Sequence, residues 1–168
     1  MNTVESRGES HGFVWECVAM DLGHRCGYVQ IPDGHPLYGL SFCDKAPGFE
    51  LADVADEPAG KRGILSLLLS RVGDDNSITL DVLFNVHGSL TFGGSRYSNT
   101  DWWLGFDCGH YGDAPDLAIM SDQHREIEGR WASRVGVIHT QEYVEAECIA
   151  LAEQIAQRFP IAEEDKIR

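Results

Sequence analysis

Hydrophobic and polar residues alternate along several stretches of the chain, which is typical of β-strands with one buried face. Residues 13–20 and 25–31 are rich in Val, aromatic and Cys residues, and the Asp and Gly of residues 21–24 favour a tight turn between them. The alternation is clearest over residues 78–86, and another strand is predicted over 102–108. The pattern therefore predicts a mostly antiparallel sheet of about four to six strands.

The C-terminal part of the chain changes to helical spacing. Thr140 is placed to cap a helix, and Pro160 is placed to end it, because proline cannot continue the hydrogen-bonding pattern. The apolar positions that recur at this spacing and form one buried stripe are Val144, Cys148, Leu151 and Ile155. A helix over residues 140–159 is therefore predicted to pack on one face of the sheet, which makes the fold class α+β.

The remaining segments define the expected domain organisation. The apolar run in residues 61–72 fits a short helix or a strand, and we favour the helix. Residues 1–11 offer little to bury and are predicted to form a disordered tail, as are residues 161–168. A single α+β domain is expected over residues 12–160.

Composition and charge limit the classes of partner. The 168-residue chain is 43% hydrophobic and 24% charged, as in ordinary globular proteins. Its formal net charge of −14 would repel a phosphate backbone, so nucleic acid is not an expected partner. The longest apolar run, residues 64–69, is far short of the ~18–20 residues that span a bilayer. The five cysteines form no C-x-x-C pair, and no secretory leader is evident, so we expect a reducing cytoplasm.

The strongest candidate for chemistry is a pair of polar residues on neighbouring predicted strands. If residues 78–86 and 102–108 pair as a hairpin with Phe92 near Trp102, His87 lies opposite Asp107, at the ~4.5–5.5 Å spacing of cross-strand partners. A carboxylate that accepts from one imidazole nitrogen orients the ring and raises its basicity. In an enzyme, His87 and Asp107 would then be the catalytic pair.

A one-residue shift in strand register predicts different chemistry. It places His87 beside Cys108 and His110, residue types that bind zinc. The strand pattern favours the unshifted register, so no metal site is favoured and zinc remains the alternative cofactor. An equally supported interpretation gives these residues only structural roles, with His87 at a sheet edge and Asp107 in a turn.

Further polar and glycine residues are predicted to surround this pair, because glycine inside strands marks bends or close approach of a ligand. The expected ligand-binding residues are His35, Asn85, His87, Gly88, Thr91, Asp107, His110 and Asp113.

Two segments of this region resemble motifs of a family of small uncharacterised proteins encoded by phages and prophages. The family carries Val-His-Gly-Gly-Leu-Thr and Gly-Phe-Asp-Cys-Ala-His-x-Gly-Asp, and the matching stretches here are residues 86–91 and 105–113. Ser89 and Gly109 depart from these patterns. The resemblance implies an accessory protein that works in the cytoplasm of a bacterial host, where such proteins often counteract host defence.

Three functions are compatible with these features. The first is binding of a small nucleotide-like host ligand, as in sequestration of an immune signal. The second is hydrolysis of a phosphodiester or related bond in such a ligand, through a His–Asp pair or a metal. The third is an acidic protein–protein inhibitor, which ranks last because the acidic residues are dispersed. A homo-oligomer with shared pockets is compatible with the first function.

Overall fold

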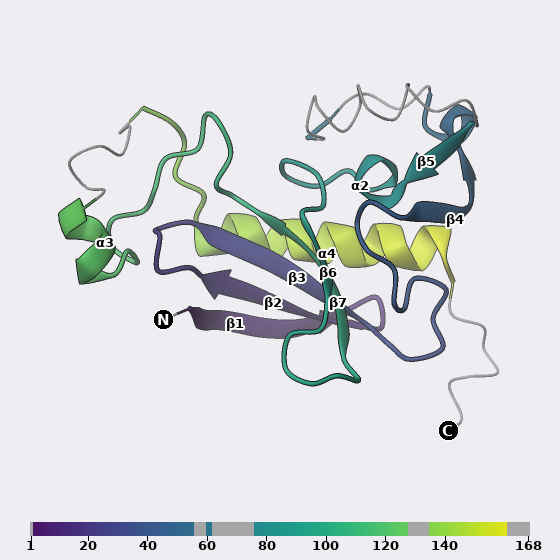
Figure 1. Cartoon of the computed structure of the whole chain (residues 1–168), viewed down its shortest axis with the longest axis horizontal. Helices are drawn as coiled ribbons and strands as arrows, with labels where there is room; N and C mark the ends of the chain where they lie inside the picture. The colour runs from purple at the N-terminus through teal and green to yellow at the C-terminus, as the bar shows by residue number, and fades with distance from the viewer. Residues whose placement is uncertain (1, 56–59, 62–75, 128–134, 161–168) are drawn as a thin grey trace.

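A five-stranded antiparallel sheet forms the centre of the computed structural model, which describes residues 2–55, 60–61, 76–127 and 135–160 (Figure 1). The strand order is β1-β2-β3-β7-β6. The strands are β1 (Thr3–Ser10), β2 (Phe13–Ala19), β3 (Arg25–Ile31), β6 (Phe92–Gly94) and β7 (Trp102–Asp107). This architecture confirms the predicted α+β class, the hairpin formed by β2 and β3, and the strand near residues 102–108.

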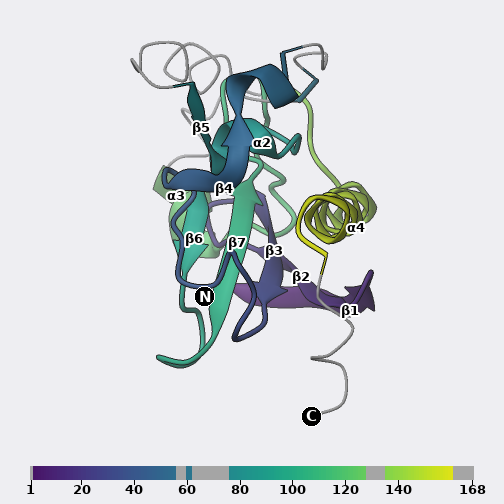
Figure 2. The same ribbon diagram turned by 90° about the vertical axis from the view of Figure 1, so that its right-hand side faces the viewer.

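The long helix α4 (Gln141–Arg158) packs along one face of this sheet, as predicted. Figure 2 views the helix nearly end-on beside β2 and β3. The hydroxyl of Thr140 accepts from the backbone N–H of Tyr143 at 3.3 Å, which confirms the expected N-cap. The four residues of the predicted stripe, Val144, Cys148, Leu151 and Ile155, are all fully buried.

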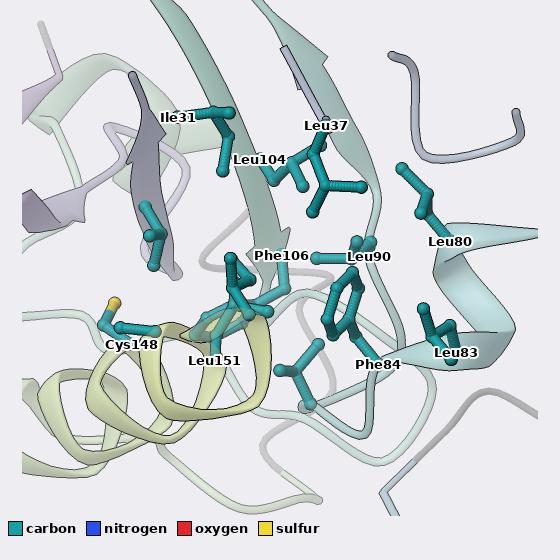
Figure 3. Close-up of a cluster of buried hydrophobic side chains, with 14 of the residues drawn as sticks. Ile31, Leu37, Leu80, Leu83, Phe84, Leu90, Leu104, Phe106, Cys148 and Leu151 are labelled. Atoms are coloured by element: carbon teal, nitrogen blue, oxygen red, sulfur yellow. The ribbon is translucent and has the colours of Figure 1, made fainter. Parts of the chain in front are cut away.

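The hydrophobic core lies between α4 and the sheet and continues beneath a smaller layer (Figure 3). Phe106 of β7 lies over Leu151 of α4, and Leu104 of the same strand lies beside Leu37. The smaller layer contains β4 (Lys45–Glu50), β5 (Ser77–Thr79), the 3-10 turn η1 (Leu51–Asp53) and the one-turn helix α2 (Leu80–Leu83). A separate short helix, α3 (Asp122–Ile127), follows the loop that leaves β7. No helix in the described ranges is long and apolar enough to cross a membrane.

The prediction of a disordered tail over residues 1–11 was wrong. Residues 3–10 form an edge strand of the sheet. β1 pairs antiparallel with β2 from Thr3 opposite Ala19 to Ser10 opposite Phe13, with an irregularity between Val4 and Ser6. The backbone hydrogen bonds of a sheet edge are available to polar sequences as well as to apolar ones. The predicted helix near 61–72 and the tail at 161–168 fall almost entirely outside the described residues.

The stretch predicted as the clearest strand, residues 78–86, is also corrected. Only Ser77–Thr79 is a strand, and α2 follows immediately. Leu83, which breaks the apparent alternation, is fully buried together with its neighbours, so this stretch enters the core from several sides. The backbone N–H and C=O of Asn85 pair with the side chain of Gln154 on α4, in place of a neighbouring strand.

Candidate functional site

Three segments that are distant in sequence meet near the beginning of α4. His87 follows α2, Asp113 lies in the loop after β7, and His139 precedes the N-cap of α4. The segments around Asp113 and His139 run side by side, where Asp113 forms a parallel bridge with Val137 (Figure 1). Two backbone hydrogen bonds of 2.9 Å, each involving Val137, fix this bridge.

Asp113 is the centre of the cluster. One carboxylate oxygen, Oδ2, lies 3.0 Å from Nε2 of His87, and the other, Oδ1, lies 2.8 Å from Nε2 of His139. The backbone N–H of His110 also donates to Oδ2 at 2.8 Å. Burial opposes ionisation of this side chain, which is 9% exposed, but the hydrogen bonds outweigh it and hold the pKa of Asp113 below its usual value.

His87 is fixed at both ends of its imidazole. Nε2 contacts Asp113, and Nδ1 lies 3.1 Å from the hydroxyl of Tyr143 on α4. The His87 ring also packs against the His139 ring, with centroids 4.3 Å apart. The backbone N–H of His87 donates to Glu147 at 3.0 Å. The ring therefore has a defined orientation and no ring nitrogen without a partner.

One face of α4 and the residue before its cap supply a row of polar groups at intervals of four. This row consists of His139, Tyr143 and Glu147, and Glu147 is only 3% exposed and pairs with Lys61. Burial, with a contribution from the negative charge of Glu147, raises the pKa of Tyr143 to about 12. The Tyr143 hydroxyl therefore stays protonated at neutral pH and can donate or accept.

His110 completes the cluster on the side of β7. Its Nδ1 is buried and has no hydrogen-bond partner in the described part of the chain, although Asp113 Oδ2 and Asp107 Oδ1 lie 3.7 and 3.8 Å away. Its ring packs on Gly88, whose φ is +65°. A Cβ at residue 88 would lie 2.2 Å from Cε1 of His110, so only glycine leaves room for the ring.

The structure separates the predicted catalytic pair. β6 pairs with β7 in the register Phe92 opposite Gly105, not near Trp102, and His87 lies outside any strand. Asp107 instead accepts from the backbone of Gly109 at 2.9 Å and faces His110. The partner of His87 is Asp113, because the loop after β7 turns back toward α4 and brings this later carboxylate to the ring.

Of the other predicted ligand-binding residues, three have local structural roles. His35 is buried against Phe13 and Phe159 and bonds only to backbone groups. The side chain of Asn85 accepts from the backbone of Lys61 at 2.7 Å. Thr91 is exposed, and its backbone N–H pairs with Gly105. Only His87, Gly88, His110 and Asp113 meet at the cluster, with Asp107 at its edge.

The alternative zinc ligand Cys108 is buried on the α4 side of the sheet, and burial raises the pKa of its thiol. In the described ranges, the group whose ligand atoms all lie within 4.8 Å of one another is His87, Asp113 and His139. The structure therefore does not bring Cys108, His110 and His87 together as metal ligands. The described residues that could hold a metal ion are His87, Asp113 and His139.

Sequence reasoning missed His139, Tyr143 and Glu147. Their spacing of four residues is a signal that could have found them, because such residues share one side of a helix. A glutamate on a surface helix ordinarily faces water, whereas Glu147 is buried beneath the cluster.

Comparison of the chain with protein-family models, with curated proteins and with solved structures gave no match. The geometry of the cluster therefore carries the functional argument.

Proposed function

We propose that the protein binds a small nucleotide-like molecule at the cluster of His87, His110, Asp113 and His139 and hydrolyses a phosphodiester or related bond in it. The observation that carries this proposal is the Asp113 carboxylate, which lies within hydrogen-bond distance of Nε2 of two histidines. A carboxylate placed in this way orients imidazoles for proton transfer or ligand binding. The motif resemblance adds the proposed setting, an accessory protein of phage type that acts on a host signal.

His110 is the residue best placed to move a proton. Both ring nitrogens of His87 are occupied, whereas Nδ1 of His110 has no partner among the described residues and faces two carboxylates at 3.7 and 3.8 Å. The His110 side chain is 34% exposed, so a ligand can reach the ring. With its Nδ1 edge toward the carboxylates, Nε2 is the nitrogen that can take a proton from water.

In the proposed reaction, the water oxygen attacks phosphorus while its proton passes to His110. The bond between phosphorus and the leaving oxygen breaks, that oxygen takes up a proton from solvent, and His110 returns the proton it received to solvent, so the ring is neutral again. Binding precedes this step and is retained if the chemistry is blocked. Sequestration without hydrolysis is therefore a measurable outcome of the same experiment.

The test is incubation of the purified chain with a panel of cyclic and ADP-ribose-type nucleotides, followed by heat denaturation and chromatography. New products support hydrolysis, and intact ligand that is released only on denaturation supports binding alone. Free, unaltered nucleotide throughout the panel would overturn both.

Matched variants connect the result to the cluster. We expect His110→Asn to reduce product formation by ~10²-fold or more, as for loss of a general acid–base group. His11→Asn is the control, because His11 is exposed and has a φ of +53°, which asparagine tolerates well. Equal rates in the two variants would remove His110 from the mechanism.

A further inference from the structure

We propose that His87, Asp113 and His139 bind a divalent transition-metal ion, with Zn²⁺ as the expected occupant and one coordination position left for a ligand. The use of this ion in binding or hydrolysing a nucleotide-like molecule rests on the proposed function. Metal binding itself can be measured independently of hydrolysis.

The positions of the ligand atoms fit a small ion. Nε2 of His87 and Nε2 of His139 lie 3.0 and 2.8 Å from the two oxygens of Asp113, and one ligand atom from each residue lies within 4.8 Å of the others. In a tetrahedral zinc site with bonds of about 2.0–2.2 Å, neighbouring ligand atoms are about 3.3–3.6 Å apart. An ion therefore requires each imidazole to withdraw from its carboxylate oxygen by a few tenths of an ångström. It also requires the two imidazole nitrogens, which lie within 4.8 Å of each other, to take up the tetrahedral spacing, and the loss of the protons that the three groups share.

The donor set favours a site with an open position. Two imidazoles and one carboxylate are the protein ligands of several catalytic zinc sites, in which water or substrate takes the fourth position. Structural zinc sites instead use four protein ligands, mostly thiolates and imidazoles. Among the described residues the group consists of these three ligands and does not include Cys108, so the arrangement is of the open kind.

The groups around the ligands already orient them. Histidines that bind a metal through one nitrogen usually donate the other N–H to a neighbouring group, and Nδ1 of His87 has the Tyr143 hydroxyl at 3.1 Å. The backbone N–H of His110 holds Asp113 at 2.8 Å. Two of the three ligands therefore have outer partners before any ion arrives.

Arg25 fixes the two loops that carry Asp113 and His139. Its guanidinium is buried and donates from Nη1 to the Asp116 carboxylate at 3.0 Å and to the carbonyl of His139 at 3.1 Å. Glu5 on β1 holds the other side of the guanidinium at 2.6 and 3.1 Å. Within the described part of the chain, Arg25 contacts the cluster only through the backbone carbonyl of His139. The two loops are therefore held together even when the hydrogen bonds between the side chains of the cluster are lost.

The experiment uses the full chain, stripped of metal with a chelator and then titrated with Zn²⁺. Calorimetry and elemental analysis should give one zinc per chain, and Co²⁺ in place of zinc should give the intense visible absorption of a four-coordinate site. We expect Asp113→Asn and His139→Asn each to weaken zinc binding by more than the ~10–100-fold that loss of an outer partner costs.

Three controls match these variants. Asp122→Asn changes a fully exposed carboxylate, and His11→Asn changes an exposed imidazole, so both should bind zinc like the unaltered chain. Cys108→Ala should also retain zinc, because the thiol lies outside the ligand set. Circular dichroism and thermal unfolding identify any variant that fails to fold, and zinc binding is then judged on the other ligand variant.

Each result has a defined meaning. Failure of the folded, unaltered chain to bind zinc would overturn the metal site, as would unchanged zinc binding in both ligand variants or its loss in Cys108→Ala. Zinc binding without new products supports the metal site and contradicts hydrolysis. Product formation by the metal-free chain supports hydrolysis and contradicts a catalytic role for the metal ion.

Discussion

Two buried carboxylates lie on opposite sides of the sheet, Glu16 and Asp113. The side chains that contact each of them indicate which carboxylate is structural and which is a candidate for function. Glu16 on β2 is 2% exposed and lies 2.6 Å from both the Arg96 guanidinium and the Tyr97 hydroxyl. Arg7 approaches its other oxygen at 3.4 Å. Asp113 is almost as buried, at 9%, but its side-chain partners are histidines.

The Glu16 cluster is saturated by groups that do not exchange protons near neutral pH. Arg96 lies 3.7 Å from the centre of the Tyr28 ring and 5.0 Å from that of Trp103, on the sheet face away from α4. A guanidinium stays charged at any ordinary pH and stacks well on aromatic rings. This arrangement stabilises one structure.

The Asp113 cluster has the opposite properties. Imidazoles titrate near neutral pH and bind metals through either ring nitrogen. The histidines come from loops and a helix terminus, whereas Glu16, Tyr28 and Trp103 lie on strands. Burial alone therefore does not distinguish the two clusters. They differ in the partners of the carboxylate, because the imidazoles beside Asp113 can exchange protons or bind a metal near neutral pH.

The largest expected effect is on stability, from Arg96→Met. This change leaves the Glu16 charge buried without its main partner, which should lower the free energy of unfolding by about 3–5 kcal/mol in urea titrations. Zinc stoichiometry of the folded fraction should not change. Arg125→Met is the control, because its ion pair with Asp122 is exposed and long at 3.8 Å and its other contact is one hydrogen bond to the Met120 carbonyl, so it should cost only about 1 kcal/mol. Loss of zinc binding in folded Arg96→Met would contradict the separation of the two clusters.

The next effect should be on activity, from Gly88→Ala compared with Gly34→Ala. Both glycines have positive φ, so backbone strain alone should cost each variant about 1–2 kcal/mol of stability, and the contact with the His110 ring adds to this cost at residue 88. Only residue 88 also displaces the His110 ring, since nothing lies within 4 Å of a Cβ at residue 34. Product formation should fall by ~10²-fold in Gly88→Ala alone. Similar rates in both variants would show that the position of His110 does not matter.

A smaller effect is expected from Tyr143→Phe, measured by zinc titration. The change keeps the aromatic packing but removes the partner of His87 Nδ1, and should weaken zinc binding by ~10–100-fold. Tyr111→Phe, at a fully exposed ring, should leave zinc affinity unchanged. If the two variants bind zinc equally, Tyr143 does not position His87.

The smallest effect concerns His35, a buried histidine without a carboxylate partner. Its Nδ1 accepts from the backbone N–H of Leu37 at 3.1 Å, so Nε2 carries the proton and donates to the carbonyl of Phe159 at 3.2 Å. Burial disfavours the charged ring and lowers the pKa of His35, although the Phe159 carbonyl opposes this shift. The neutral form is therefore the one that fits the fold.

This pKa shift predicts a stability that decreases with acidity. The unfolded chain takes up the proton first, near its ordinary pKa of about 6.5, so the free energy of unfolding should fall below about pH 7. The contribution of one such group is at most about 1.4 kcal/mol per pH unit. Urea titrations from pH 8 to pH 5.5 should show a smaller decrease for His35→Asn than for His11→Asn. Parallel curves would assign the pH dependence to other groups.

Much of the fold followed from local patterns in the sequence. The hairpin of β2 and β3, the strand β7, the cap at Thr140 and the stripe of α4 depend on near neighbours along the chain. The alternation that suggested a strand over 78–86 was misleading, because it cannot show that Leu83 is buried as well. The edge strand β1 was missed because its sequence is polar and its pairing is supplied by β2.

The candidate site was predicted only in part, because its contacts depend on strand register and not on local sequence patterns. His87, His110 and Asp113 stood out in the sequence, but the partner chosen for His87 depended on an assumed register between two strands. The actual pairing of β6 with β7 is displaced by three residues, with Phe92 opposite Gly105.

The sequence by itself determined the strand β7, the helix α4 and the choice of His87, His110 and Asp113 as candidates, because capping, turn chemistry and hydrophobic periodicity act over a few residues. Only the tertiary structure decided that Asp113 lies between His87 and His139, each 26 residues away in sequence. That contact depends on strand register, on the path of the loop after β7 and on the packing of α4. These are set by interactions between distant segments, which no local pattern records.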